Sequence, residues 1–297
     1  MLNGLKEYYK NHSYYNRLSP LSYVFVFFID LIILIKTSFK TFRNFKNFRD
    51  TKSLKNTFKD QNAFVFANGP SLNKVDLNKV KQLQQNSGNK VICVNSFISK
   101  LSHKLIPDYY VLSDPVYFGF DQELHSKTVY KDVKEDLDLI EKYNVTVFIP
   151  LKFKNNFKIN TNIYYFNDME IRRFNRNITD ITKPRSYLSM TSYKALAIAY
   201  YLGFKKIYIS GYDNNYFKTI EVDKNNKIYY NENHAFKQDD NNQYNIDQHY
   251  SLNMKLGKFL LDLSYLFLDL YKFPKNIINL DEESLVDSFV KENIFKN

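Results

Sequence analysis

The sequence predicts an α/β protein with a Rossmann-like, mostly parallel sheet and helices on both faces. From residue 63 onward, short apolar runs alternate with amphipathic segments. Such strand-helix alternation implies a mostly parallel sheet that is covered on both sides. The length of 297 residues suits one sizeable α/β domain with an extension. The aromatic content of 17% supplies ample apolar surface for a packed core.

The individual elements follow from these runs. We expect strands at 63–67, 91–94, 109–112, 145–150 and 207–210, and helices at 77–84, 131–143 and 192–202. Ligands of such sheets bind at the carboxyl ends of the strands, so candidate site residues are sought there.

Two further segments flank or interrupt this pattern. Residues 1–60 are interpreted as a helical extension, and residues 61–297 as the α/β domain. Within that domain, residues 214–250 are polar and rich in Asn and Tyr, which predicts a lid over the site. The turn signal Lys224-Asn225-Asn226-Lys227 predicts a small hairpin in this lid.

Charge and cysteine usage restrict the class of protein. The formal net charge of +11 favours anionic partners such as phospholipid head groups, nucleotides or acidic glycans. The single cysteine, Cys93, lies in an apolar run, which excludes an internal disulfide and a cysteine-based metal cluster. The amino terminus lacks the layout of a signal peptide, so secretion is not expected.

The extension predicts a peripheral membrane anchor. Its apolar segment, residues 23–35, is shorter than the roughly 20 residues that a spanning helix needs. Phe39, Phe42, Phe45 and Phe48 then recur at every third position among basic residues. Residues 20–59 are therefore expected to bind an anionic surface at the cytoplasmic face of the inner membrane. The alternative is a helix that packs on the protein's own body or on a second copy, which allows a homo-oligomer.

The most informative motif is Asn68-Gly69-Pro70-Ser71-Leu72, directly after the first expected strand. Glycine permits close backbone approach, and proline suits the first turn of a helix. Free N–H groups at such a turn favour an anion, which predicts a nucleotide phosphate there.

The chain resembles the bacterial sialyltransferases of glycosyltransferase family forty-two. The resemblance rests on the motif above, in which Ala67 replaces the family's first glycine, on Asn95 and on Asp114-Pro115. It continues through Thr191-Ser192 to the most specific block, Ser210-Gly211-Tyr212-Asp213, and covers roughly residues 63–290.

This resemblance implies an inverting, metal-independent transfer of sialic acid or a related acidic sugar. The donor would be a CMP-sugar, the acceptor a hydroxyl of a cell-surface glycan or glycolipid in lipopolysaccharide or capsule biosynthesis, and no cofactor would be needed. The residues that would bind the donor are Asn68, Gly69, Pro70, Ser71, Asn95, Asp114, Thr191, Ser192, Gly211 and Asp213.

Catalytic groups are expected within or beside the lid. His249, which precedes an expected helix at 253–260, is the predicted base, because histidine titrates near neutrality. His234 is the alternative base. By the resemblance, Tyr216 and Tyr230, or Tyr229 in place of Tyr230, would bond the phosphate of the leaving group.

Two other classes of function stay open. The Asn68–Leu72 and Ser210–Asp213 motifs also resemble a wider set of proteins that includes pterin diphosphokinase-like chains. That reading requires Mg²⁺ held by carboxylates such as Asp114 and Asp213. A non-catalytic basic protein that binds membranes is the third reading. A nucleic-acid partner is not expected, because no motif for one is recognised.

Overall fold

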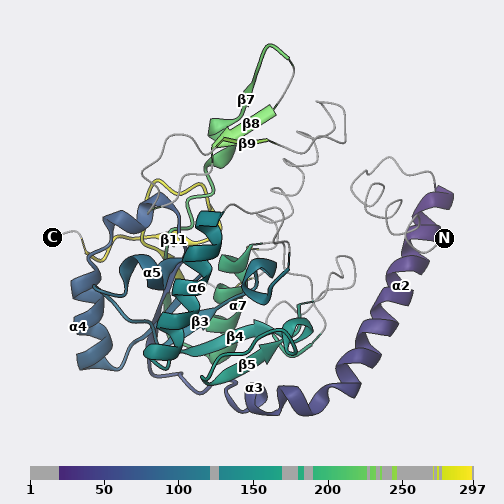
Figure 1. The fold of residues 1–297 in the computed structure, drawn as a ribbon, viewed down its shortest axis with the longest axis horizontal. Coiled ribbons are helices and arrows are strands. Elements are labelled where there is room, and N and C mark those ends of the chain that lie inside the picture. Colours follow the sequence, from purple (N-terminus) through teal and green to yellow (C-terminus); the bar gives the residue numbers. More distant parts are fainter. Residues whose placement is uncertain are drawn as a thin grey trace.

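The computed structural model describes residues 20–120, 127–168, 180–183, 190–225, 228–231, 235, 243–245, 270, 273 and 276–295. Their main feature is an eight-stranded sheet in the order β11-β10-β6-β1-β2-β3-β4-β5, with every neighbouring pair parallel. Figure 1 shows the sheet with its surrounding helices. The strands are β1 Asn62–Phe66, β2 Lys90–Val94, β3 Tyr109–Val111, β4 Thr146–Pro150, β5 Ile163–Phe166, β6 Lys206–Ser210, β10 Ile277–Asn279 and β11 Val290–Lys291.

The predicted fold class is confirmed. All five expected strands are present, as β1, β2, β3, β4 and β6, and the three expected helices are present as well. The helices are α4 Leu77–Ser87, α6 Lys127–Lys142 and α7 Thr191–Leu202, together with the short α5 Phe97–Leu101. Strands β5, β10 and β11 were not expected. The helix expected at 253–260 lies outside the described residues.

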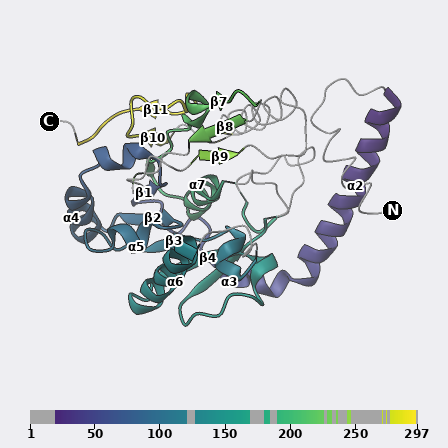
Figure 2. The ribbon, with the colours of Figure 1, turned by 45° about the horizontal axis from the view of Figure 1, so that its top comes forward.

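The core consists of two apolar layers, one on each face of the sheet. Along β1 the side chains alternate, so that Ala63 and Val65 join the layer beneath α7, while Phe64 and Phe66 join the opposite layer. Val80, Ile98 and Ile140, from α4, α5 and α6, close that opposite layer. Figure 2 shows the strands between α7 on one side and α5 and α6 on the other.

The strand order reverses direction at β1. From β1 the chain proceeds through β2 to β5 on one side, then returns to place β6 on the other side of β1. In doubly wound proteins, ligands bind where the connections from two adjacent strands run in opposite directions. The carboxyl ends of β1 and β6 are therefore the expected position of a ligand site.

The predicted hairpin is present in the segment 214–250. Strand β7, Glu221–Val222, pairs antiparallel with β8, Ile228–Asn231, around the expected turn. A third strand, β9, Gln243–Asn245, pairs with β8 and completes a small sheet. Figure 1 shows this sheet standing apart from the main one.

The amino-terminal extension is helical and is attached to the free edge of the sheet. It comprises α2 Pro20–Arg43, the 3₁₀ helix η1 Phe45–Phe48 and α3 Arg49–Ser53. The Thr51 hydroxyl donates to the carbonyl oxygen of Tyr165 at 2.8 Å and accepts from its N–H at 3.2 Å. Pairing the edge strand β5 in this way blocks its use as a template for another strand. None of the described helices combines the length and apolar character needed to cross a bilayer.

A buried carboxylate joins α6 to α5. Asp136 accepts from the Ser99 N–H at 3.1 Å and from the Tyr117 hydroxyl at 2.6 Å. Burial raises the pKa of Asp136 to about 6, and these hydrogen bonds offset only part of that effect. The folded protein therefore binds a proton that the unfolded chain releases near pH 4, so this group makes stability fall as the pH rises from about 4 to about 6.

Asp136→Asn is expected to raise the free energy of unfolding by about 2 kcal/mol at pH 8, because the amide carries no charge to desolvate. The gain should shrink steadily below pH 6. Urea denaturation at both pH values measures it, with Asp138→Asn, an exposed position on the same helix, as the matched control. An equal effect of the two substitutions at pH 8 would contradict this assignment.

Candidate active site

Four buried polar atoms lie at the switch point of the sheet. They are Asn68 Oδ1, Asn95 Oδ1, Ser210 Oγ and Asn279 Nδ2, and none has a hydrogen-bond partner among the described residues. They follow or end β1, β2, β6 and β10, which are neighbours in the sheet. Buried polar atoms are rarely left unpaired without a functional reason. Three more such atoms, Gln61 Oε1, Asn62 Oδ1 and Asn276 Oδ1, lie at the amino edge, so it is the topological switch point that selects the carboxyl edge. The carboxyl edge of these four strands is thus the candidate active site.

The two sequence motifs, Asn68–Leu72 and Ser210–Asp213, meet at this edge and are joined by hydrogen bonds. The Gly69 N–H donates to the Gly211 carbonyl at 3.1 Å, and the Gly211 N–H donates to the Ser71 hydroxyl at 3.0 Å. Asp213 accepts from the Ser71 N–H at 3.0 Å and from its hydroxyl at 2.9 Å. A Cβ on Gly69 would overlap the Asp213 carboxylate. Both glycines are therefore required for close packing of the two turns.

These hydrogen bonds change the role expected for the first turn, which was to bind a nucleotide phosphate. Residues Pro70–Lys74 form only a short 3₁₀ helix, η2, and the N–H groups of Gly69 and Ser71 already bond protein oxygens. These two groups are thus not free for a phosphate. Burial raises the pKa of Asp213, while its bonds from Ser71 act in the opposite direction.

The turn after β2 places Asn95 at the same edge of the sheet. Asn95 adopts a left-handed conformation with φ of 49°, which asparagine tolerates better than most residues. The fully buried Tyr110 hydroxyl donates to the Asn95 carbonyl and accepts from the Ile98 N–H. Held in this way, the Asn95 side chain keeps its carbonyl oxygen without a described partner.

The amino end of α7 joins the site to the strands on its other side. Helix α7 begins at Thr191, and Tyr212 donates from its hydroxyl to the Ser192 carbonyl at 2.6 Å. The Thr191 hydroxyl lies 2.7 Å from that of Ser113, just after β3. The predicted residues Thr191 and Ser192 thus lie at the carboxyl edge, as expected.

Sequence reasoning missed a buried ion pair in this part of the site. Lys194 is 4% exposed, and its Nζ lies 3.0 Å from Asp168 Oδ2 and 3.0 Å from the Ser113 hydroxyl. Lys152, which is half-exposed after β4, approaches the same carboxylate oxygen at 3.4 Å. Two cations around one carboxylate leave one positive charge in excess, which suits an anionic ligand.

Asp114, which follows β3, caps the 3₁₀ helix η3, Pro115–Phe118. Its Oδ1 accepts from the Val116 N–H at 3.2 Å. Three inter-strand spacings separate β3 from β6, roughly 14 Å in all, so the predicted pairing of Asp114 with Asp213 at one ion is unfavourable. Among the residues that the structure describes, no group of three or more His, Cys, Asp or Glu could hold a metal ion.

Within the segment 214–250, Ala235 contacts the first motif. Ala235 donates its N–H to the Asn68 carbonyl at 2.8 Å, and its carbonyl accepts from Asn73 at 3.0 Å. The lid itself stays a prediction. The predicted catalytic residues His234 and His249 lie outside the described residues, as do the side chains of Tyr216, Tyr229 and Tyr230.

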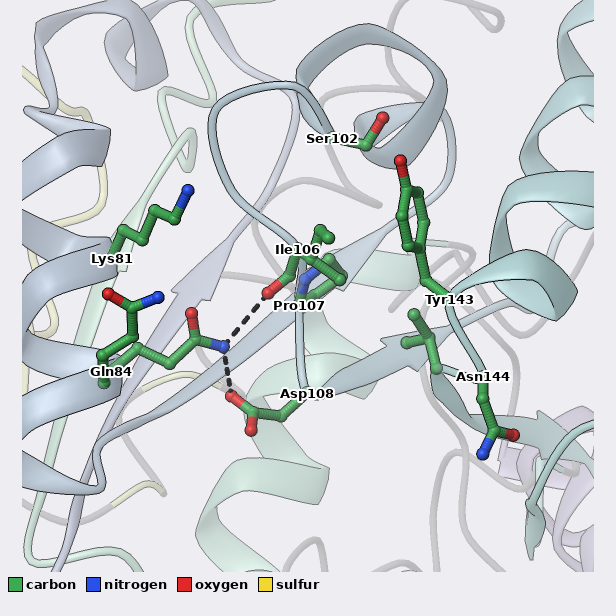
Figure 3. A pocket seen from close by; sticks show the side chains of 10 residues that line it. Lys81, Gln84, Ser102, Ile106, Pro107, Asp108, Tyr143 and Asn144 are labelled. Carbon is green, nitrogen blue, oxygen red and sulfur yellow. Dashed lines mark hydrogen bonds between the residues drawn. The ribbon is translucent and has the colours of Figure 1, made fainter.

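A cavity lies at the opposite, amino edge of the sheet. Figure 3 shows this cavity of about 440 Å³, which Gln84, Asp108 and Tyr143 line with their neighbours. Asp108 and Val145 stand before β3 and β4, at the amino ends of these strands. Asp108 is already bonded by Gln84 at 2.8 Å and by Lys90 at 2.9 Å. The cavity contains none of the predicted site residues.

A family model described as 6-hydroxymethylpterin diphosphokinase MptE-like matches residues 38–219. Since this range is more than half of the chain, the protein belongs to the MptE-like family. The match runs from the end of α2 through β6 and η6, Tyr216–Thr219, and so includes both motifs, Asn68–Leu72 and Ser210–Asp213. No curated protein matches the chain significantly.

The family match overturns the resemblance to sialyltransferases. The assignment to glycosyltransferase family forty-two is wrong, and so is the function that it implied, transfer from a CMP-sugar in lipopolysaccharide or capsule biosynthesis. The match favours an enzyme of the diphosphokinase type, which was the alternative. The physical reason is that Gly69, Ser71, Gly211 and Asp213 serve backbone packing. Residues of this kind are typical of a turn geometry and do not show which substrate the protein binds.

Proposed function

We propose that the protein transfers a pyrophosphoryl group from a nucleoside triphosphate to the hydroxymethyl group of a pterin. The observation that carries this proposal is the match of the MptE-like family model to residues 38–219. In this reaction the substrate hydroxyl oxygen attacks the β-phosphorus, and the bond from that phosphorus to the α-β bridging oxygen breaks. The nucleoside monophosphate leaves with the bridging oxygen, and the hydroxyl proton passes to solvent.

The unpaired amides suit recognition of the pterin ring. Pterin presents an amino group and a ring N–H beside a carbonyl oxygen, an arrangement that short amide side chains can bond. Asn68 Oδ1 and Asn95 Oδ1 offer two acceptors, and Asn279 Nδ2 offers a donor. A small number of fixed polar groups in a buried site is typical of specific ligand binding.

The opposite half of the site suits the phosphates. Lys194 and Lys152 place two ammonium groups around Asp168. The amino end of α7 lies beside them and has no side-chain cap, so its dipole adds positive potential. The pterin would then lie over β1 and β2 and the triphosphate over β3 to β5.

Mg²⁺ bound to the nucleotide would neutralise charge on the phosphates that react. Asp213 does not fit as its ligand, because Ser71 bonds both of its oxygens and the residue is buried. Asp114 fits better, because only its Oδ1 has a hydrogen-bond donor in the described part of the chain. A single carboxylate suffices, since Mg²⁺ commonly binds one or two carboxylates together with substrate phosphates.

The test is formation of nucleoside monophosphate from ATP with Mg²⁺, in the presence and absence of 6-hydroxymethylpterin in its oxidised and reduced forms.

Lys152→Gln is expected to raise the KM for ATP about tenfold, because it removes one charge-assisted contact. Lys158→Gln, an exposed position on the following loop, is the matched control and should leave the KM unchanged. Failure of every pterin to stimulate monophosphate release would refute the proposal.

A further inference from the structure

Helix α2 carries an apolar stripe on its outer face. Ile32, Ile35, Phe39 and Phe42 follow one another at three, four and three residues, which places them along one side of an α-helix. Their exposed fractions are 55%, 60%, 63% and 78%. Contiguous exposed apolar surface of this kind marks an interaction site.

A cationic stripe runs alongside the apolar one. Lys36, Lys40 and Arg43 each follow a stripe residue directly in sequence, so they lie about 100° further round the helix, and all three are exposed. Lys46 and Arg49 extend the series beyond the helix. Residues 31–49 contain no Asp or Glu. The combined face is therefore apolar along one side and uniformly positive along the other.

The opposite side of α2 already packs on the protein. Thr37 is 2% exposed. The Thr41 hydroxyl accepts from the Asn167 amide at 2.7 Å, just after β5. Beyond the helix, Lys154 donates to Asn47 at 2.6 Å. Figures 1 and 2 both show α2 as a long helix at the margin of the molecule. Its attachment orients the apolar stripe away from the sheet.

The charge pattern decides between two occupants of this face. The spacing of three and four residues would also suit a coiled coil with a second copy. In such a pair the basic stripes would face each other or solvent, and residues 31–49 offer no carboxylate to neutralise them. An anionic lipid surface neutralises the lysines and arginine and buries the apolar side chains at the same time.

We propose that the outer face of α2 binds an anionic phospholipid surface, with the helix lying in the plane of the interface. Ile32, Ile35, Phe39 and Phe42 enter the boundary between head groups and acyl chains. Lys36, Lys40 and Arg43 bond the lipid phosphates. This interaction holds the protein peripherally at the membrane and is independent of the proposed diphosphokinase activity.

Cosedimentation of the full chain with vesicles tests the proposal. The protein is expected to bind vesicles of equal parts phosphatidylcholine and phosphatidylglycerol, and to bind phosphatidylcholine alone far more weakly. High salt should weaken binding to the anionic vesicles. Equal binding to both vesicle types, or binding to neither, would overturn the proposal.

Two sets of substitutions locate the binding face. Changing Lys36, Lys40 and Arg43 together to Gln is expected to lower partitioning about 100-fold, since each basic residue near the surface contributes about 1 kcal/mol, or about a factor of five. The matched control changes the exposed Lys104, Lys131 and Lys134 to Gln, with the same loss of net charge and little expected effect. If both triples weaken binding equally, net charge alone attracts the protein and the assignment to α2 is wrong.

The apolar set is Ile35→Ser, Phe39→Ser and Phe42→Ser, with Val222→Ser and Val290→Ser as exposed controls on other elements. It should also reduce binding at least about 100-fold, because these side chains would no longer be buried in lipid. Sedimentation of the parent protein without vesicles tests whether a second copy of the chain occupies this face instead. If the parent does not bind vesicles but forms a dimer, and the apolar set abolishes that dimer, the face binds a second copy.

Insertion can be observed directly because the chain contains no tryptophan. Phe42→Trp introduces the only tryptophan on the stripe, and its emission, excited selectively over that of the tyrosines, should shift to shorter wavelength when anionic vesicles are added. Val290→Trp, at an exposed position on β11, should show no shift. A shift at both positions, or at neither, would contradict insertion of the α2 face.

Discussion

Gly211→Ala is expected to lower the free energy of unfolding by at least about 4 kcal/mol, which places it among the most damaging single substitutions. Gly211 has φ of +79°, a conformation that costs an L-residue about 1–2 kcal/mol. A Cβ there would overlap the Ala67 carbonyl oxygen and approach its carbon at 2.5 Å. The turns after β1 and β6 would have to separate, which would break the bonds that join Gly69 and Ser71 to Gly211.

Urea denaturation of the purified variant measures this loss, or the soluble yield does if the variant fails to fold. Gly88→Ala is the control, because Gly88 also has a left-handed φ, of +65°, but its Cβ would meet no atom closer than 3.9 Å. The control isolates the conformational strain, about 1–2 kcal/mol. Equal losses for the two variants would show that contact between the motifs does not stabilise the fold.

The central strands could be predicted because each is a continuous apolar run. Val91 to Val94, for example, is buried from both sides by helices, and all four residues are 2% exposed or less. The strands that were missed lie near or at the edges of the sheet. Strand β10 has only three residues and β11 only two, so pairing with their neighbours forms them more than local pattern does.

The aromatic pattern of the extension was interpreted incorrectly in one respect. Phe39, Phe42 and Phe45 are exposed, but Phe48 is 1% exposed, in the segment where η1 contacts β5. A spacing of three residues drifts by about 60° per step on an α-helix, so Phe39 and Phe48 would lie on opposite sides. The periodicity thus already contained the signal that one of the four would pack inward. The boundary at residue 60 and the membrane role stay predictions.

The positions of candidate site residues could be predicted where the residues follow strands, and could not be predicted where they lie on a helix. Asn68, Asn95 and Asp114 follow β1, β2 and β3, and the topology brings such positions to one edge. Lys194 stands in the apolar helix α7, where a single lysine is usually an exposed residue. Its burial depends on Asp168, 26 residues earlier in the chain, and no local pattern reports that pairing.

Lys194→Met is expected to lower the free energy of unfolding by about 3 kcal/mol. Removing one partner leaves the Asp168 carboxylate buried, and the loss of one member of a buried pair typically costs about 3–5 kcal/mol. The lower end applies because Lys152 still approaches Asp168 at 3.4 Å. The Ser113 hydroxyl also loses its charged donor.

The double variant Lys194→Met with Asp168→Asn separates the charge from the packing. Because it removes the unpaired carboxylate as well, it should recover about 2 kcal/mol relative to the sum of the single changes. Additive losses would mean that the two groups do not interact energetically. If the double variant is stable but binds ATP at least about tenfold more weakly, Lys194 contributes its charge to the ligand as well as to the fold. Unchanged affinity would leave Lys194 a structural residue and transfer the phosphate contact to Lys152 and the amino end of α7.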